Sequence, residues 1–178
     1  MNTKTMLLTA MAAITIAGQP STAVANGMAF GRYQAPAPLE GTWVVTIRPI
    51  VCTGPTAGTD VPGIPAVISH LTFARGGTMT EATSNPNFGP GKRSAGHGYW
   101  ERTGRTSYQF AMQAFLNEPN APYKTGLQRI EQTVELHTED DWTSSGPVRF
   151  FETFDLSLTP GLVPYRAGCA RATGVRFY

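Results

Sequence analysis

The positions of two cysteines limit the possible folds of this chain more than any other feature. Cys52 ends an alternating segment, residues 39–52, and Cys169 begins the last segment, residues 169–178. An even pair of cysteines in an exported protein is more often bridged than free. A bridge would hold the two Cα atoms within about 7 Å of each other. The first and last strands would then lie side by side, which is what a closed barrel requires.

Export is predicted from residues 1–25. Lys4 precedes the apolar run MLLTAMAAITIAG, and Ala23 and Ala25 supply small residues at the two positions that a signal peptidase recognises. The apolar run is shorter than the stretch of about 20 residues that a transmembrane helix needs. We therefore expect a signal peptide that is cleaved before Asn26, a secreted or periplasmic protein, and no integral membrane span.

Charge and composition favour a β protein without a polyanionic partner. The 178 residues include 14 lysines and arginines against 12 aspartates and glutamates. This near-neutral balance gives no electrostatic basis for binding nucleic acid or an anionic membrane. Charged residues make up only 15% of the chain, whereas there are 19 glycines and 14 prolines. Such a composition is typical of a turn-rich β protein.

Alternation of apolar and polar residues predicts about eight strands. Trp43 and Val45, for example, share one face of the first predicted strand. The fold class is therefore all-β: a single closed antiparallel up-and-down β-barrel over residues 39–178, after a flexible lead-in, residues 26–38. The predicted strands lie in residues 39–52, 66–83 (a hairpin), 97–116 (a second hairpin), 126–138, 147–158 and 169–178, with turns or loops between them, including residues 139–146.

Three motifs resemble a known group of barrels. Gly41-Thr42-Trp43 has the G-x-W pattern of lipocalins and their calycin relatives. The pattern F-x-x-G-G-T over residues 73–78, the pattern G-x-G-x-W-x-R over residues 96–102 and the cysteine in the last strand are similar to small exported bacterial calycin-like proteins. Many of those proteins have no assigned activity. The loop after the first strand is shorter than in lipocalins, and we expect no helix after the barrel.

The resemblance covers residues 39–178 and carries two implications. An arginine of the final strand would pack against Trp43, and Arg176 is the best match for it, with Arg171 the second. The interior would hold a hydrophobic ligand, by analogy with the transport of such ligands in that family.

Glu152 is the first candidate for chemistry. It shares a face with Phe150 and Phe154, and that face is otherwise apolar. A buried carboxylate must be paired or protonated. We expect either a structural ion pair with an inward arginine, such as Arg102 or Arg176, or a ligand anchor or general acid inside the barrel. A bulge in this strand would instead turn Glu152 outward.

The other predicted ligand-binding residues share the apolar faces of their strands. A few polar groups in an aromatic-lined cavity are typical of small-molecule sites. The predicted ligand-binding residues are Tyr108, Phe110, Gln132, Phe150 and Glu152, and the predicted structural residues are Trp43, Arg176, Cys52 and Cys169.

His97 is the second catalytic candidate. It lies between Gly96 and Gly98 at the start of a predicted strand, and a histidine at a barrel rim is a candidate acid or base because its unperturbed pKa is about 6.5. The alternative is an exposed side chain without a role, between glycines that let the backbone bend. His70 and His137 lie on other strands, and no pair has metal-ligand spacing. We predict neither a metal nor a cofactor.

These observations lead us to expect an exported β-barrel that holds a small, largely apolar molecule in its interior. One alternative is a cyclase or isomerase of the allene-oxide-cyclase-like barrel type, acting on a hydrophobic substrate through a carboxylate such as Glu152. Another is a protein-binding or inhibitory barrel that uses its rim loops. An unpaired Glu152 in a cavity would favour the enzyme. An ion pair between Glu152 and an arginine would favour passive ligand binding, and a barrel without a cavity would favour the protein-binding alternative. Whether the protein is an enzyme is left open, as is its oligomeric state.

Overall fold

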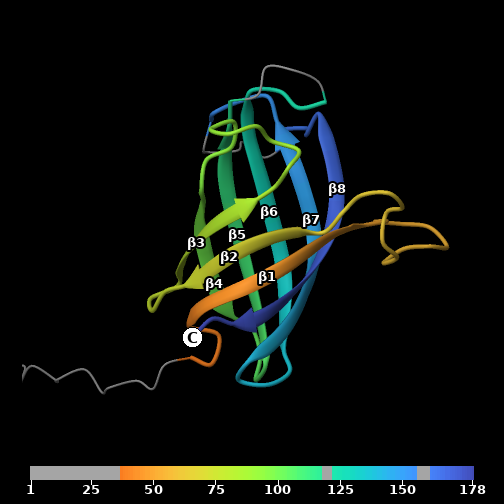
Figure 1. Cartoon of the computed structure of the whole chain (residues 1–178). Coiled ribbons are helices and arrows are strands. Elements are labelled where there is room, and N and C mark those ends of the chain that lie inside the picture. The colour runs from red at the N-terminus through yellow and green to blue at the C-terminus, as the bar shows by residue number, and fades with distance from the viewer. Residues whose placement is uncertain (1–36, 118–121, 156–160) are drawn as a thin grey trace, which may run out of the picture. The chain divides into compact units, whose positions relative to one another are not determined.

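The structure, a computed structural model, describes residues 37–117, 122–155 and 161–178. These residues contain no helix, and their eight strands form one closed barrel in which each strand pairs antiparallel with the next and the last with the first (Figure 1). The predicted all-β, closed, up-and-down barrel is confirmed. The strands are β1 (Gly41–Ile50), β2 (Val67–Phe73), β3 (Thr78–Ser84), β4 (Gly96–Arg102), β5 (Ser107–Leu116), β6 (Gly126–Leu136), β7 (Asp141–Phe151) and β8 (Arg166–Arg176).

Closure of the barrel joins the two ends of the domain. The β1–β8 ladder runs from the pair Trp43 and Arg176 to the pair Ile50 and Cys169. Just beyond this ladder Cys52 forms a disulfide with Cys169, with the Cα atoms 5.3 Å apart. The predicted pairing is therefore present, and the bridge holds the first strand against the last at one end of the barrel.

The seventh strand begins earlier than the sequence predicts. Residues 139–146 are expected to turn the chain, but the turn is shorter, with the backbone N–H of His137 donating to the carbonyl of Asp141, and β7 starts at Asp141. Trp142 and Ser144 then face the interior. The prediction is wrong here because aspartate, serine and glycine, which favour turns, also fit the small or polar positions of this strand.

The core fills one end of the barrel. Trp43 is fully buried there, donates from Nε1 to the carbonyl of Leu39 at 3.0 Å, and packs edge-on to Trp142 with 6.1 Å between ring centroids. The guanidinium of Arg176 covers the Trp43 ring at 4.2 Å, as the resemblance implies. It also donates to the carbonyls of Glu40 and of residues 38 and 139. Arg176 therefore ties the entry of the chain and the β6–β7 turn to the closed end of the barrel.

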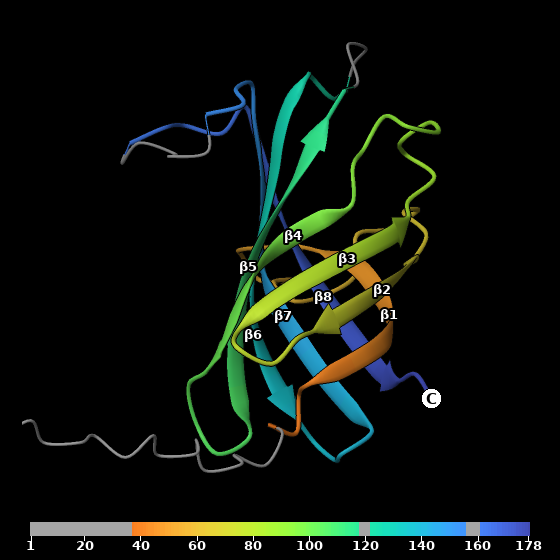
Figure 2. The ribbon, with the colours of Figure 1, turned by 90° about the vertical axis from the view of Figure 1, so that its left-hand side faces the viewer.

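The opposite end of the barrel carries the longer loops. The described parts of the loops after β3, β5 and β7 lie toward the upper end in both views (Figures 1 and 2), whereas the short turns after β4 and β6 lie at the lower end. The predicted signal peptide, residues 1–25, and residues 26–36 of the lead-in lie outside the described residues. Ala37, predicted to belong to the flexible lead-in, packs against the core.

The glycines beside His97 let strands approach closely. A Cβ built at Gly98 would lie 2.0 Å from the backbone oxygen of Ala111 and 2.6 Å from the Cα of Met112 on β5. Because both atoms belong to the backbone, a side chain at this position would force β4 and β5 apart. We expect Gly98→Ala to lower the free energy of unfolding, measured in urea, by about 1–3 kcal/mol, as overpacking does.

Gly168 on β8 supplies the matched control. A Cβ built there meets no atom within 4 Å, so Gly168→Ala should change stability by no more than about 1 kcal/mol. If Gly98→Ala proved as stable as Gly168→Ala, the close approach of β4 to β5 would be wrong.

Candidate functional site: the barrel cavity

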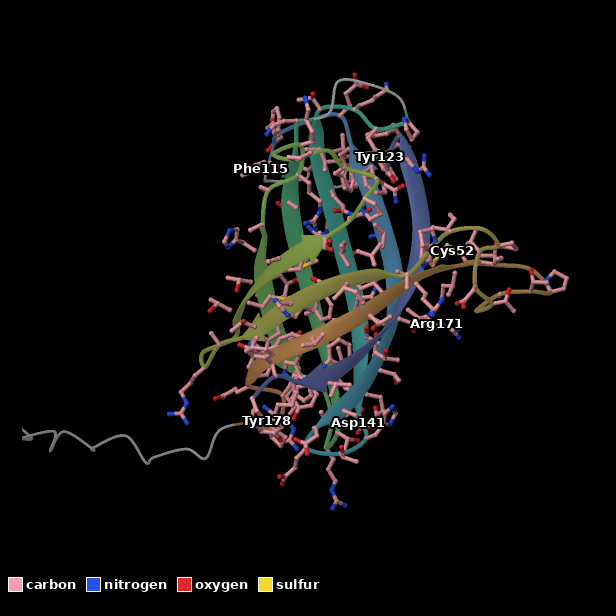
Figure 3. The ribbon with its side chains drawn as sticks, in the orientation of Figure 1. Cys52, Phe115, Tyr123, Asp141, Arg171 and Tyr178 are labelled. Atoms are coloured by element: carbon pink, nitrogen blue, oxygen red, sulfur yellow. A yellow bond between two sulfur atoms is a disulfide. The ribbon has the colours of Figure 1, made fainter. Side chains whose placement is uncertain are left out.

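The interior above the core is hollow. A cavity of about 330 Å³ extends from the core toward the loop end of the barrel. Tyr123, which lines its mouth, lies at that end in Figure 3, whereas Asp141 and Tyr178 mark the opposite end. Cys169, one half of the disulfide, also lines the cavity. The bridge therefore lies at the cavity wall as well as at the seam between β1 and β8.

Most of the cavity wall is apolar. The inward residues of β1, β2, β5 and β7 supply much of it, because alternate residues of each strand point to the interior. At the mouth the ring of Tyr123 lies 5.2 Å from that of Phe150 and 4.6 Å from that of Phe88. The apolar lining includes Val45, Ile47, Val67, Leu71, Phe110, Met112, Ile130, Trp142, Val148, Phe150 and Ala172.

One ion pair is buried in the cavity wall. Arg93 Nη1 donates to Glu81 Oε2 at 2.8 Å, and the two side chains are only 5% and 1% exposed. Arg93 Nε donates to Gln128 Oε1 at 2.6 Å, and the hydroxyl of Ser69 donates to Glu81 Oε1 at 3.1 Å. Arg93 thus supplies the opposite charge that a buried carboxylate requires. The single proton of the Ser69 hydroxyl is shared between Glu81 Oε1 and the carbonyl oxygen of Ala82, which lies 3.0 Å from it.

The Glu81–Arg93 pair explains why a glycine suits position 96, and it fixes the course of the β3–β4 loop. A Cβ built at Gly96 would lie 2.8 Å from Glu81 Oε2, so a larger residue would crowd the carboxylate. Arg93 comes from the loop between β3 and β4, and it reaches Glu81 on β3 and Gln128 on β6. The pair therefore fastens this loop across the interior near the mouth.

The deeper part of the cavity contains polar atoms without hydrogen-bond partners. The hydroxyl of Ser144 donates to Gln132 Oε1 at 3.1 Å, but Gln132 Nε2 is buried and unpartnered among the described residues. Trp142 Nε1 is also buried and has no hydrogen-bond partner among the described residues. The Trp142 indole packs against Gly174, where an added Cβ would lie 2.5 Å from Nε1. The lower wall therefore offers uncharged donors rather than charges.

Three of the five predicted ligand-binding residues line the cavity. Phe110, Gln132 and Phe150 contribute to its wall and are each buried. Tyr108 does not line it, because it lies in the packed core, fully buried beside Trp100. Its hydroxyl is a further buried polar atom without a partner among the described residues.

The expectation that Glu152 lies inside the barrel is wrong. β7 ends at Phe151, so Glu152 falls beyond the strand, where alternation of the side chains no longer applies. Its side chain is 62% exposed and pairs with Lys124 Nζ at 2.5 Å. The interior arginine partners that the sequence suggests, Arg102 and Arg176, make other contacts: Arg102 bonds backbone oxygens of the β4–β5 turn, and Arg176 bonds the closed end.

His97 points away from the cavity. It is exposed on β4, between the inward positions of Gly96 and Gly98, and it does not line the interior. Among the described residues, no group of three or more histidine, cysteine, aspartate or glutamate side chains is placed to hold a metal ion.

The side chains with shifted pKa values lie outside the cavity. Burial raises the pKa of Glu131, but hydrogen bonds and charges from Arg129 and Arg149 outweigh burial and leave this pKa below its usual value. Hydrogen bonds from two neighbouring hydroxyl groups lower the pKa of Glu135, and a hydrogen bond to a carboxylate raises the pKa of Tyr178. None of these three groups lines the cavity, so their shifts do not mark a reactive group there.

Glu81 and Arg93 are the site residues that sequence reasoning missed. Glu81 has a signal, since it shares the inner face of β3 with Met79, two residues before it. Arg93 has none, because it lies in a segment rich in glycine and proline that has no periodicity. Only the folded loop brings Arg93 to Glu81.

Comparisons with protein-family models, with curated proteins and with solved structures return no match. The closed eight-stranded barrel is compatible with a calycin-like fold. In the part of the chain that the structure describes, no helix has the length and apolar character needed to cross a membrane.

Proposed function

We propose that this protein is a calycin-like β-barrel that binds one small, largely apolar molecule in its interior. The observation that carries the proposal is the cavity of about 330 Å³ with a mainly apolar wall. Small-molecule sites have volumes of about 300–1,000 Å³ and combine such walls with a few polar groups. Transfer of an apolar ligand from water to this wall would provide the main driving force for binding.

The state of the interior carboxylate favours binding over catalysis. A cyclase or isomerase would use an acid or base that faces the substrate, and Glu152 is outside the cavity. Glu81 does line the cavity, but its carboxylate is held in a buried ion pair with Arg93 at 2.8 Å. A solid barrel acting through its rim would not need the hollow interior. We therefore favour a binding protein over both alternatives.

Export remains part of the proposal. The Cys52–Cys169 disulfide supports a secreted or periplasmic location, because such bridges persist in oxidising compartments. Together with the predicted signal peptide, it suggests that the barrel meets its ligand outside the cytoplasm.

Blocking the cavity tests the proposed function. Ala170 lines the cavity and is buried on β8, so the phenyl ring of Ala170→Phe should fill the cavity. We expect the unmodified protein to bind naphthalene saturably in calorimetric titration, and Ala170→Phe to lose at least about tenfold in affinity, which corresponds to about 1.4 kcal/mol.

Ala82→Phe is the matched control for this experiment. Ala82 is exposed on the outer face of β3, so this variant should bind naphthalene as the unmodified protein does. No saturable binding by the unmodified protein, or equal binding by both phenylalanine variants, would refute an interior site.

A further inference from the structure

We infer that the ligand carries one uncharged hydrogen-bond acceptor, such as a ketone, aldehyde or ester oxygen, and that Gln132 Nε2 binds this oxygen inside the cavity. This inference rests on the proposed function and specifies the chemical class of the ligand. It is carried by the buried, unpartnered amide nitrogen of Gln132 in the cavity wall.

In the structure the Oε1 half of the Gln132 amide faces Ser144, and the Nε2 half is free of hydrogen bonds to the described residues. Gln132 is 6% exposed, and the hydroxyl of Ser144 holds its Oε1 at 3.1 Å. Its Nε2 has no partner among the described residues. An apolar ligand atom against this nitrogen would leave its N–H groups unsatisfied, whereas an acceptor oxygen would replace the hydrogen bonds that water makes.

The surroundings of Gln132 favour a small and mainly hydrocarbon ligand around that oxygen. Phe110 pairs with Gln132 across β5 and β6, and Ile130 lies on the same face of β6. Both are apolar parts of the cavity wall. A cavity of about 330 Å³ has room for roughly ten non-hydrogen atoms, if each takes about the 30 Å³ of a water molecule.

The charges of the cavity favour an uncharged acceptor. The only cations among the described lining residues are Arg93 and Arg166. Arg93 is neutralised by Glu81, and it lies at the level of Gln128, four residues nearer the mouth on β6 than Gln132. Arg166 lies at the mouth, stacked 5.2 Å from the Tyr123 ring. A carboxylate bound beside Gln132 would therefore lose its hydration without gaining an opposite charge.

Three probes of matched shape test the inference. Benzylacetone is a methyl ketone, isopentylbenzene replaces its carbonyl oxygen by a methyl group, and hydrocinnamate replaces its methyl group by a carboxylate oxygen. We expect benzylacetone to bind more tightly than hydrocinnamate. Gln132→Met, which keeps the length of the side chain but lacks the N–H groups, should weaken benzylacetone binding by about three- to tenfold and leave isopentylbenzene binding unchanged or stronger.

Gln109→Met is the matched control, because Gln109 is exposed on the outer face of β5. If Gln132→Met weakened the binding of benzylacetone and of isopentylbenzene equally, the inference would be overturned, but an interior site would remain. Tighter binding of hydrocinnamate than of benzylacetone would also overturn it. Failure of the unmodified protein to bind any of the three probes would instead refute the proposed function.

A measurement without any variant keeps the inference testable even if Gln132→Met does not fold. In protein labelled with nitrogen-15, the side-chain amide signals of Gln132 should shift downfield in the proton dimension when benzylacetone is added, because its N–H would then donate to the ketone. Isopentylbenzene should not produce this downfield shift. The same shift with both probes would overturn the assignment of Gln132 as the donor.

Discussion

Arg93→Met is expected to lower the free energy of unfolding by about 3–5 kcal/mol, because it leaves a buried carboxylate without its opposite charge. Glu81 is the carboxylate concerned: its side chain is 1% exposed, and Arg93 Nη1 lies 2.8 Å from its Oε2. Gln128 would lose its donor in the same variant. Urea unfolding followed by tryptophan fluorescence measures the loss, with Arg105→Met, an exposed arginine of the β4–β5 turn, as the control.

The double variant Glu81→Leu/Arg93→Met removes both charges of the ion pair, so it separates the effect of an unpaired buried carboxylate from the effect of losing the pair as a whole. An apolar pair in place of a buried ion pair is often neutral or stabilising, so the double variant should be more stable than Arg93→Met alone. A double-mutant cycle reports the difference as a coupling energy. Purely additive losses would show that the two side chains do not depend on each other, and the account of the pair would then be wrong.

Trp43→Ala should lower the melting temperature by roughly 10 °C. Truncation of a buried tryptophan costs about 3–5 kcal/mol, and each kcal/mol shifts the melting temperature of a domain of this size by about 2–4 °C. Trp43 is fully buried and bonds the carbonyl of Leu39. The variant also removes the ring on which Arg176 lies at 4.2 Å.

Calorimetry or fluorescence during heating measures this change, and Tyr99→Ala is the control. Tyr99 is a large aromatic residue that is 55% exposed on β4, so its truncation should shift the melting temperature by only a degree or two. An unchanged melting temperature in Trp43→Ala would place Trp43 outside the core.

Alternation predicted much of the barrel because each strand has one face in the core. Phe110, Gln132 and Phe150 were placed on inward faces from their spacing alone, and all three line the cavity. The start of β7 was missed because Trp142 and Ser144 are embedded among turn-forming residues. Glu152 was misplaced for a related reason, since alternation is informative only up to the residue at which the strand ends.

The amino-acid sequence by itself predicted the closed antiparallel barrel, because residue alternation indicates about eight strands and a bridge between the two cysteines would bring the first strand against the last; the structure confirms both. The tertiary structure alone decided which acidic side chain is enclosed together with a partner for its charge. Glu81 is inside because the chain folds a loop arginine, Arg93, onto it, whereas Glu152 is outside because β7 stops at Phe151. Burial of a charge depends on a partner that is distant in the chain, and local patterns do not report such partners.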